Sequence, residues 1–114
     1  MGKGWFVSGN DRWVRVASTD DLEEDDVMEI LVGDLTLALY RTEDGFFATD
    51  GICTHELARL CDGFVFGNII ECPKHQGRFD VRSGKPKGAP VHVALRTYPV
   101  RVVGTDLEVG LGFE

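Results

Sequence analysis

Two short motifs in the sequence each pair a cysteine with a histidine. The first is Cys53-Thr54-His55, a C-x-H pattern, and the second is Cys72-Pro73-Lys74-His75, a C-x-x-H pattern, with sixteen residues between them. Thiolates and neutral imidazoles are common protein ligands for transition metals. The two motifs together therefore predict one metal centre with four protein ligands.

Two kinds of centre use two cysteines and two histidines. Structural zinc sites often have this ligand set, but zinc fingers place both cysteines in one motif and both histidines in another. In a Rieske-type two-iron, two-sulfur cluster, two histidines replace two cysteines on one of the two irons. Because each motif here contains one residue of each type, the spacing favours the iron-sulfur cluster, and zinc is the alternative.

The residues around the motifs carry a family resemblance. CTHELARL (53–60) and DGFVFGNIIECPKHQGRFDVRSGKP (62–86) resemble the cluster-binding segment of the Rieske [2Fe-2S] ferredoxins in multicomponent aromatic-ring-hydroxylating dioxygenase systems. The resemblance implies one [2Fe-2S] cluster per chain, with Cys53 and Cys72 on one iron and His55 and His75 on the other. It also implies that the histidines lie near the surface, where electrons enter and leave.

The same resemblance implies a role and partners. It predicts an electron carrier rather than an enzyme, passing single electrons from an NAD(P)H-dependent flavoprotein reductase to a terminal Rieske oxygenase through transient complexes. The chain has no G-x-G-x-x-G nucleotide fingerprint. His92, the histidine outside the motifs, cannot alone supply the two-histidine, one-carboxylate iron site of an oxygenase. A small module of assimilatory nitrite reductase and a redox sensor are alternative functions.

Three positions depart from the respiratory-complex branch of the Rieske family. That branch has an extra cysteine in each loop, forming a disulfide, and a serine and a tyrosine whose hydroxyls bond sulfur atoms. Lys74, Gly77 and Phe79 stand at matching positions here, and the first loop also lacks the extra cysteine. We therefore expect no disulfide and a reduction potential toward the lower end of the Rieske range of about −150 to +300 mV.

The remaining sequence predicts short antiparallel strands in one all-β domain, a sandwich or barrel-like Rieske fold. Gly33-Asp34 and Gly67-Asn68 have the composition of two-residue hairpin turns. One helical turn is expected within 20–26, capped by Ser18, Thr19 or Asp20. We expect a single domain over 1–114 with a cluster-binding subdomain at about 46–88. The expected strands are 12–16, 28–32, 35–40, 46–49, 63–66, 69–71, 78–81, 95–102 and 107–109.

Composition and charge limit the partners and the location. A formal net charge of −7 on 114 residues argues against nucleic-acid binding. Residues 20–29 carry seven carboxylates and no base, whereas residues 74–101 carry seven Lys or Arg against one acid. This asymmetry either orients docking or is a solvated acidic loop with scattered cations. Without an apolar run long enough for a membrane or a secretory signal, we expect a cytoplasmic monomer, and we assign no function to residues 1–10.

Three further features have two interpretations each. Cys61 is expected to be buried as a small apolar side chain rather than to have a redox role. We expect His92 to be a surface or strand residue. The segment containing Pro86, Gly88 and Pro90 either resembles the family's proline-containing loop over the cluster or is an ordinary turn.

Overall fold

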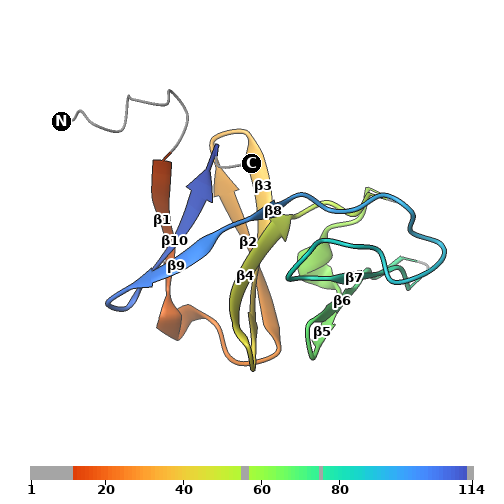
Figure 1. The fold of residues 1–114 in the computed structure, drawn as a ribbon, viewed down its shortest axis with the longest axis horizontal. Coiled ribbons are helices and arrows are strands. Elements are labelled where there is room, and N and C mark those ends of the chain that lie inside the picture. Colours follow the sequence, from red (N-terminus) through yellow and green to blue (C-terminus); the bar gives the residue numbers. More distant parts are fainter. Residues whose placement is uncertain (1–11, 55–56, 75, 113–114) are drawn as a thin grey trace.

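Antiparallel strands form most of the chain in the computed structural model, which describes residues 12–54, 57–74 and 76–112 (Figure 1). They make three sheets, and the all-β prediction is confirmed. The first sheet has the order β1 (Arg12–Ser18), β10 (Asp106–Leu111), β9 (Val100–Val103). The second has the order β2 (Asp26–Val32), β3 (Leu35–Thr42), β4 (Gly45–Asp50), β8 (Thr97–Tyr98). The third has the order β5 (Phe64–Phe66), β6 (Ile69–Glu71), β7 (Arg78–Asp80).

The first two sheets pack around one apolar core, and we call them together the two-sheet base. Alternate side chains of their strands point inward, as expected for sheets with one buried face. This core consists of Ala17, Leu22, Ile30, Leu37, Leu39, Ala48, Tyr98, Leu107, Val109 and Leu111.

The third sheet lies beside the base with the long connections around it (Figure 1). We call residues 51–96 the loop end. It has a second core, made of Ala38, Tyr40, Cys53, Ala58, Leu60, Ile70, Cys72, Phe79, Val81, Val91 and Leu95. Both motif cysteines therefore lie in the core that joins the loop end to the base.

Strand β3 contributes to both cores. Leu37 and Leu39 face the core of the base, whereas Ala38 and Tyr40 face the core of the loop end. The hydroxyl oxygens of Tyr40 and Thr49 lie 2.8 Å apart, and the Thr49 hydroxyl donates to the next backbone carbonyl at 2.7 Å, so Tyr40 is the donor in the first bond. Burial raises the pKa of Tyr40 above its usual value, which keeps the phenol neutral. The loop end therefore packs against one face of β3, and the other face of this strand is buried in the core of the two-sheet base.

The predicted hairpin turns are present. Gly33 and Gly67 have φ values of 57° and 59°, which glycine adopts at little cost, and each begins a two-residue connection between paired strands. These turns fix the registers of β2 with β3 and of β5 with β6.

Two local expectations need correction. The single strand expected over 95–102 is wrong, because β8 pairs with β4 and β9 pairs with β10. Pro99 separates them and has no N–H for a ladder, so the chain changes sheets there. The helical turn is the 3-10 helix η2 (Thr19–Asp21), which begins after its N-cap Ser18 and ends before most of the expected segment. A second 3-10 helix, η3 (Leu60–Asp62), follows the first cysteine loop. No helix in the described ranges is long and apolar enough to cross a bilayer.

Candidate metal centre

The first cysteine loop begins directly after β4. The backbone N–H of Cys53 donates to the carbonyl of Ala58 at 2.9 Å, which closes the loop. Behind it, Gly51 N–H donates to Thr36 O at 2.9 Å and Leu60 N–H donates to Gly51 O at 2.8 Å. These bonds fix the start of the loop to β3 and its end to Gly51, the first residue after β4.

The second cysteine loop begins directly after β6 and is closed in the same way. The N–H of Cys72 donates to the carbonyl of Gly77, five positions later, at 2.6 Å, just as Cys53 donates to Ala58. The N–H of Lys74 lies 3.5 Å from the Cys72 sulfur, to which it donates. A donor at this position favours the negatively charged thiolate over the thiol.

Both motif cysteines are buried. Cys53 is 2% exposed and Cys72 is 1% exposed, and neither forms a disulfide. The two belong to the same core cluster, although they come from different loops. Two thiols brought together from equivalent loops are a suitable ligand pair for one metal ion. His55 and His75 lie outside the described residues, so their predicted roles as ligands stay a prediction.

A third segment crosses both cysteine loops. The hydroxyl of Thr54 donates to the carbonyl of Val93 at 2.7 Å, which joins the segment to the first loop. The buried Val91 packs against Gly77 of the second loop, where a Cβ in place of the glycine hydrogen would lie 2.6 Å from Val91 Cγ1. The residues that follow Pro86, Gly88 and Pro90 therefore contact both cysteine loops, and the role of this segment as a loop over the cluster stays a prediction.

The residues present fit a two-iron, two-sulfur cluster. The donor set has soft thiols at the buried side, and Gly77 lets the third segment approach the second loop without a side chain between them. Apolar neighbours such as Ile70 and Phe79 surround the thiols and limit the access of water.

Ion pairs and hydrogen bonds connect the loop end to the two-sheet base. Asp80 accepts hydrogen bonds from the backbone N–H of Arg82 at 2.8 Å and from its Nη2 at 2.9 Å, and the side-chain bond is the main reason that the pKa of Asp80 is lowered. Arg82 also lies 4.0 Å from Asp44 in the β3–β4 turn, whose Oδ2 accepts from Asn68 at 2.6 Å. Thr42 donates to the Asn68 side chain at 2.7 Å.

Two other candidate residues lie apart from the loops. The expectation that Cys61 is buried as a small apolar side chain is wrong, because the residue is only partly buried and its sulfur lies 3.4 Å from Arg59 Nη2 and 3.8 Å from Glu29 Oε1. Burial raises the pKa of the Cys61 thiol above its ordinary value, although Arg59 opposes the shift. His92 is exposed, as expected.

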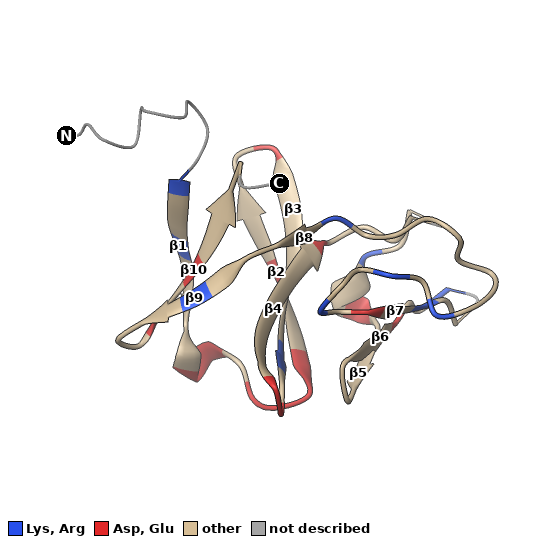
Figure 2. Cartoon of the chain, viewed as in Figure 1, with Lys and Arg blue, Asp and Glu red and all other residues tan. Residues whose placement is uncertain are grey.

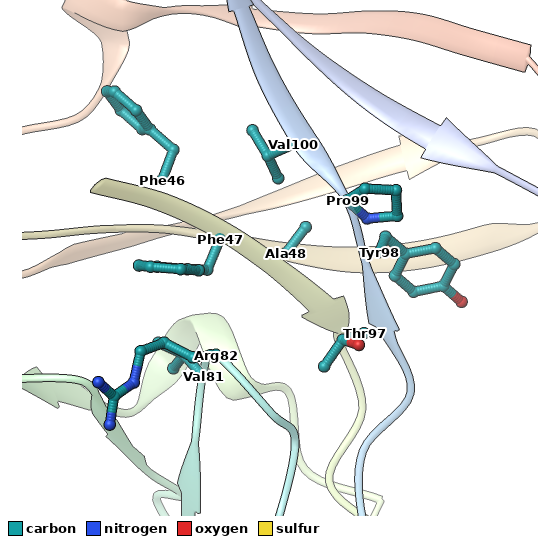
Figure 3. Close-up of a pocket in the computed structure, with 9 residues that line it drawn as sticks. All are labelled: Phe46, Phe47, Ala48, Val81, Arg82, Thr97, Tyr98, Pro99 and Val100. Carbon is teal, nitrogen blue, oxygen red and sulfur yellow. The ribbon is translucent and has the colours of Figure 1, made fainter. Parts of the chain in front are cut away.

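A pocket of about 510 Å³ lies between the base and the loop end (Figure 3). Phe46 and Val100 line it from the two-sheet base, and Val81 and Arg82 line it from the loop end. Beside it, the Tyr98 hydroxyl donates to Asp50 Oδ1 at 2.6 Å, and burial and this bond raise the pKa of Tyr98 to about 12. Neither motif cysteine lines the pocket, so it is distinct from the candidate centre.

Comparison with known proteins decides between the alternatives for this centre. The family model of the Rieske [2Fe-2S] domain matches residues 12–99. The chain belongs to the Rieske family. It therefore carries one [2Fe-2S] cluster, and the zinc alternative is excluded.

Relatives with known roles narrow the place of this Rieske chain within the family. It is 43% identical over 101 residues to the ferredoxin component of the naphthalene 1,2-dioxygenase system of Pseudomonas aeruginosa, covering 89% of this chain and 97% of that protein. It is 47% identical over 90 residues to the ferredoxin component of the naphthalene 1,2-dioxygenase/salicylate 5-hydroxylase systems of Ralstonia sp., covering 79% and 86%. The chain is thus a Rieske ferredoxin, an electron carrier.

A solved structure supports the same placement. A chain in the complex of reduced oxygenase and oxidized ferredoxin in carbazole 1,9a-dioxygenase superposes on this Rieske ferredoxin with a TM-score of 0.81 and 36% identity. The match covers 86% of this chain and 92% of that chain. The predicted family, fold class, cofactor and electron-carrier role are confirmed.

Proposed function

We propose that this ferredoxin receives single electrons from an NAD(P)H-dependent flavoprotein reductase and passes them to a terminal aromatic-ring-hydroxylating Rieske oxygenase. The observation that carries the proposal is the similarity, over nearly the full length of the relatives, to proteins named as ferredoxin components of dioxygenase systems. The fold also matches a ferredoxin chain solved together with an oxygenase.

A reconstituted electron chain tests this function. Purified holoferredoxin is added to the reductase and oxygenase of the naphthalene 1,2-dioxygenase system, and NAD(P)H consumption is compared with the formation of dihydroxylated product. We expect product only when the ferredoxin is present, in proportion to the NAD(P)H consumed. Electron delivery to an assimilatory nitrite reductase, without delivery to any ring-hydroxylating oxygenase tested, would replace the proposal by its rival.

We assign Cys53 and Cys72 to one iron and His55 and His75 to the other. The cluster supplies one-electron redox chemistry when bound. The support from the described residues is the pair of buried thiols in equivalent loops, closed by Cys53 N–H to Ala58 O and by the corresponding bond of the second loop. The protein's own part is to keep the thiols away from water and to present a hydrogen-bond donor, the Lys74 N–H, to one sulfur.

Electron-nuclear double resonance of the reduced protein tests the ligand assignment. With ¹⁵N-labelled histidine we expect couplings to two ligand nitrogens, together with a rhombic signal whose average g lies below the free-electron value. The exposed His92 offers a matched control, because His92→Gln should leave both couplings intact. Loss of a coupling in that control, or a single coupling in the wild type, would contradict the assignment.

We also expect a low reduction potential. The two positions at which the respiratory branch has hydroxyls are Gly77 and Phe79, both buried here. Since hydrogen bonds to sulfur stabilise the reduced state, their absence should place the midpoint toward the lower end of the range of about −150 to +300 mV. Protein-film voltammetry giving a midpoint above about +100 mV would contradict this expectation.

The remaining parts of the proposal concern organisation and location. We propose a cytoplasmic monomer that forms one domain over 1–114, with a cluster-binding subdomain at about 46–88, and that acts without nucleic acid or membrane. None of the three cysteines, all of which the structure describes, is in a disulfide, which agrees with a reducing compartment.

A further inference from the structure

The loop end and the rest of the chain carry opposite net charges. Residues 51–96 contain seven Lys or Arg against four Asp or Glu, a net charge of +3. The rest of the chain contains five against fifteen, a net charge of −10. Figure 2 shows blue segments along the loops beside β7 and red segments at the turns of the base. The protein is therefore strongly polarised along the direction from the base to the loop end.

Ion pairs with carboxylates of the same chain neutralise three arginines of the loop end. Arg59 binds Glu29 at 3.0 Å and Arg78 binds Glu71 at 2.9 Å. Arg82 binds Asp80, also at 2.9 Å. These cations are already satisfied by carboxylates of the same chain.

Three lysines of the loop end are different. Lys74, Lys85 and Lys87 are exposed, and none of them forms an ion pair with a described residue. Lys74 lies inside the second cysteine loop, while the N–H of Lys87 donates to Arg78 O at 2.8 Å, beside that loop's exit. Their positive charge is available to a partner at the place where the cluster is held.

Two exposed apolar side chains lie on the adjoining loops. Leu57 is 90% exposed in the first cysteine loop, and Val93 is 63% exposed in the third segment. The bond from the Thr54 hydroxyl to Val93 O connects the two loops that carry them. Exposed apolar residues grouped near a functional centre and rimmed by charge are typical of interaction sites.

We propose that Leu57, Val93, Lys74, Lys85 and Lys87, which we call the lysine face, dock on a carboxylate-rich rim around an apolar recess of the terminal oxygenase. The inference rests on the proposed function and goes beyond it by naming the surface and the chemistry of the partner's site. The acidic rim attracts the lysines and repels the two-sheet base, which carries a net negative charge. The electrostatic field therefore turns the loop end toward the partner before contact. The small apolar centre then makes a short-lived complex, as a shuttle requires.

The first test is the salt dependence of electron transfer. Holoferredoxin is reduced chemically with dithionite, so that no reductase is needed, and mixed by stopped flow with the oxygenase of the naphthalene system. We expect the second-order rate constant to fall by about 10-fold between about 0.02 M and about 0.3 M salt, because screening shortens the reach of the lysine charges. A rate constant that does not change with salt, or rises with it, would overturn the proposal that the lysine face docks on the oxygenase.

The second test removes the charges one at a time. Lys74→Gln and Lys87→Gln should each lower the rate constant at low salt by about 2–5-fold and flatten its salt dependence, because charges at the rim of an interface act mainly on association. Lys74→Arg and Lys87→Arg should keep wild-type rates. The matched control is Arg12→Gln on β1, which removes the same charge from an exposed cation of the base and should not slow transfer.

Two readouts separate docking from other causes. The midpoint potential of each variant is measured, so that a slower rate with an unchanged potential reports docking. Equal slowing of electron transfer by Arg12→Gln and Lys74→Gln would show a net-charge effect and overturn the docking role of the lysine face. Lysine effects that occur only with the reductase would overturn that role as well. If the dithionite-reduced wild type delivers no electrons to any oxygenase at low salt, the proposed function itself fails. If Lys74→Gln and Lys87→Gln deliver electrons at the wild-type rate, only the proposed docking surface is overturned.

Discussion

The base and the loop end of this ferredoxin are built by different means. The base uses strands of up to eight residues with continuous ladders, such as β3 against β2 and β4. The loop end uses strands of three residues, and its shape depends on loop closures, a core shared with β3 and a few side-chain contacts. Long ladders tolerate the loss of one contact, whereas a set of short elements depends on each contact separately.

This difference follows from what each part must do. The base only needs a stable platform, and a period-two pattern of apolar side chains suffices for it. The loop end must hold two thiols from separate loops in one place. We therefore expect substitutions in the loop end to cost more, and to act more locally, than matched substitutions in the base.

Cys72→Ser should have the largest effect. A serine hydroxyl stays protonated and is a poor ligand for iron in place of a thiolate, so we expect complete loss of iron, sulfide and visible absorbance. The strands of the base should persist in far-UV circular dichroism, because their core contains neither motif cysteine. Cys61→Ser is the matched control and should keep the cluster. Retention of wild-type iron in Cys72→Ser, or loss of iron in Cys61→Ser, would go against the assignment.

Glycine substitutions compare the two regions directly. Gly84 has φ 78°, and a Cβ there would clash with the backbone carbonyl of Leu95, which cannot move without breaking the Leu95 N–H to Gly84 O bond. Gly104, in the β9–β10 turn, has φ 64° and open space around the Cβ position. In urea unfolding we expect Gly84→Ala to lower the free energy of unfolding by about 2–4 kcal/mol and Gly104→Ala by about 1 kcal/mol. Equal losses would mean that the loop end is no more constrained than the base.

Asp80→Asn tests the ionic connection between the two regions. Because its folded-state pKa lies below its unfolded value, Asp80 contributes stability above the unfolded pKa of about 3.9, and this contribution is lost as the pH falls through the lower, folded pKa. We expect the variant to be less stable by about 1–3 kcal/mol at neutral pH, with the difference shrinking in acid. Urea titrations at several pH values measure it, with Asp34→Asn in the exposed β2–β3 turn as the control. A difference that persists unchanged in strong acid would exclude the ionic cause.

Local patterns in the sequence were enough to predict the class of the fold and the two cysteine loops. The turns at Gly33 and Gly67 have a short-range signal. Cys72 directly follows the strand predicted at 69–71, and Cys53 comes shortly after the strand predicted at 46–49. The split at Pro99 was missed because the apolar pattern continues through it, and only pairing partners distant in sequence show that the chain changes sheets. The surroundings of Cys61 were missed for a similar reason, since Glu29 is 32 residues away.

Within the candidate site, the same limit separates what was predictable from what was not. The motif predicts thiols and imidazoles as ligands, because ligand chemistry depends on residue type. It contains no sign that Thr54 bonds to Val93 or that Val91 packs on Gly77, because these contacts join segments that only the folded chain brings together. The positioning contacts of the loop end are therefore visible only in the structure.

Thr54→Val should have the smallest effect and the most local one. The substitution keeps the shape of the side chain but removes the 2.7 Å bond to Val93 O, so we expect a loss of about 0.5–1.5 kcal/mol in the local stability of the third segment. Native-state hydrogen exchange should then be faster at the amides of Val91 and Leu95, which donate to Gly88 O and Gly84 O, while β3 and β10 keep their protection. Thr54→Ser restores the hydroxyl and should exchange like the wild type. If the serine variant exchanges as fast as the valine variant, the methyl group rather than the hydrogen bond holds the segment, and the loop end depends on packing alone at this point.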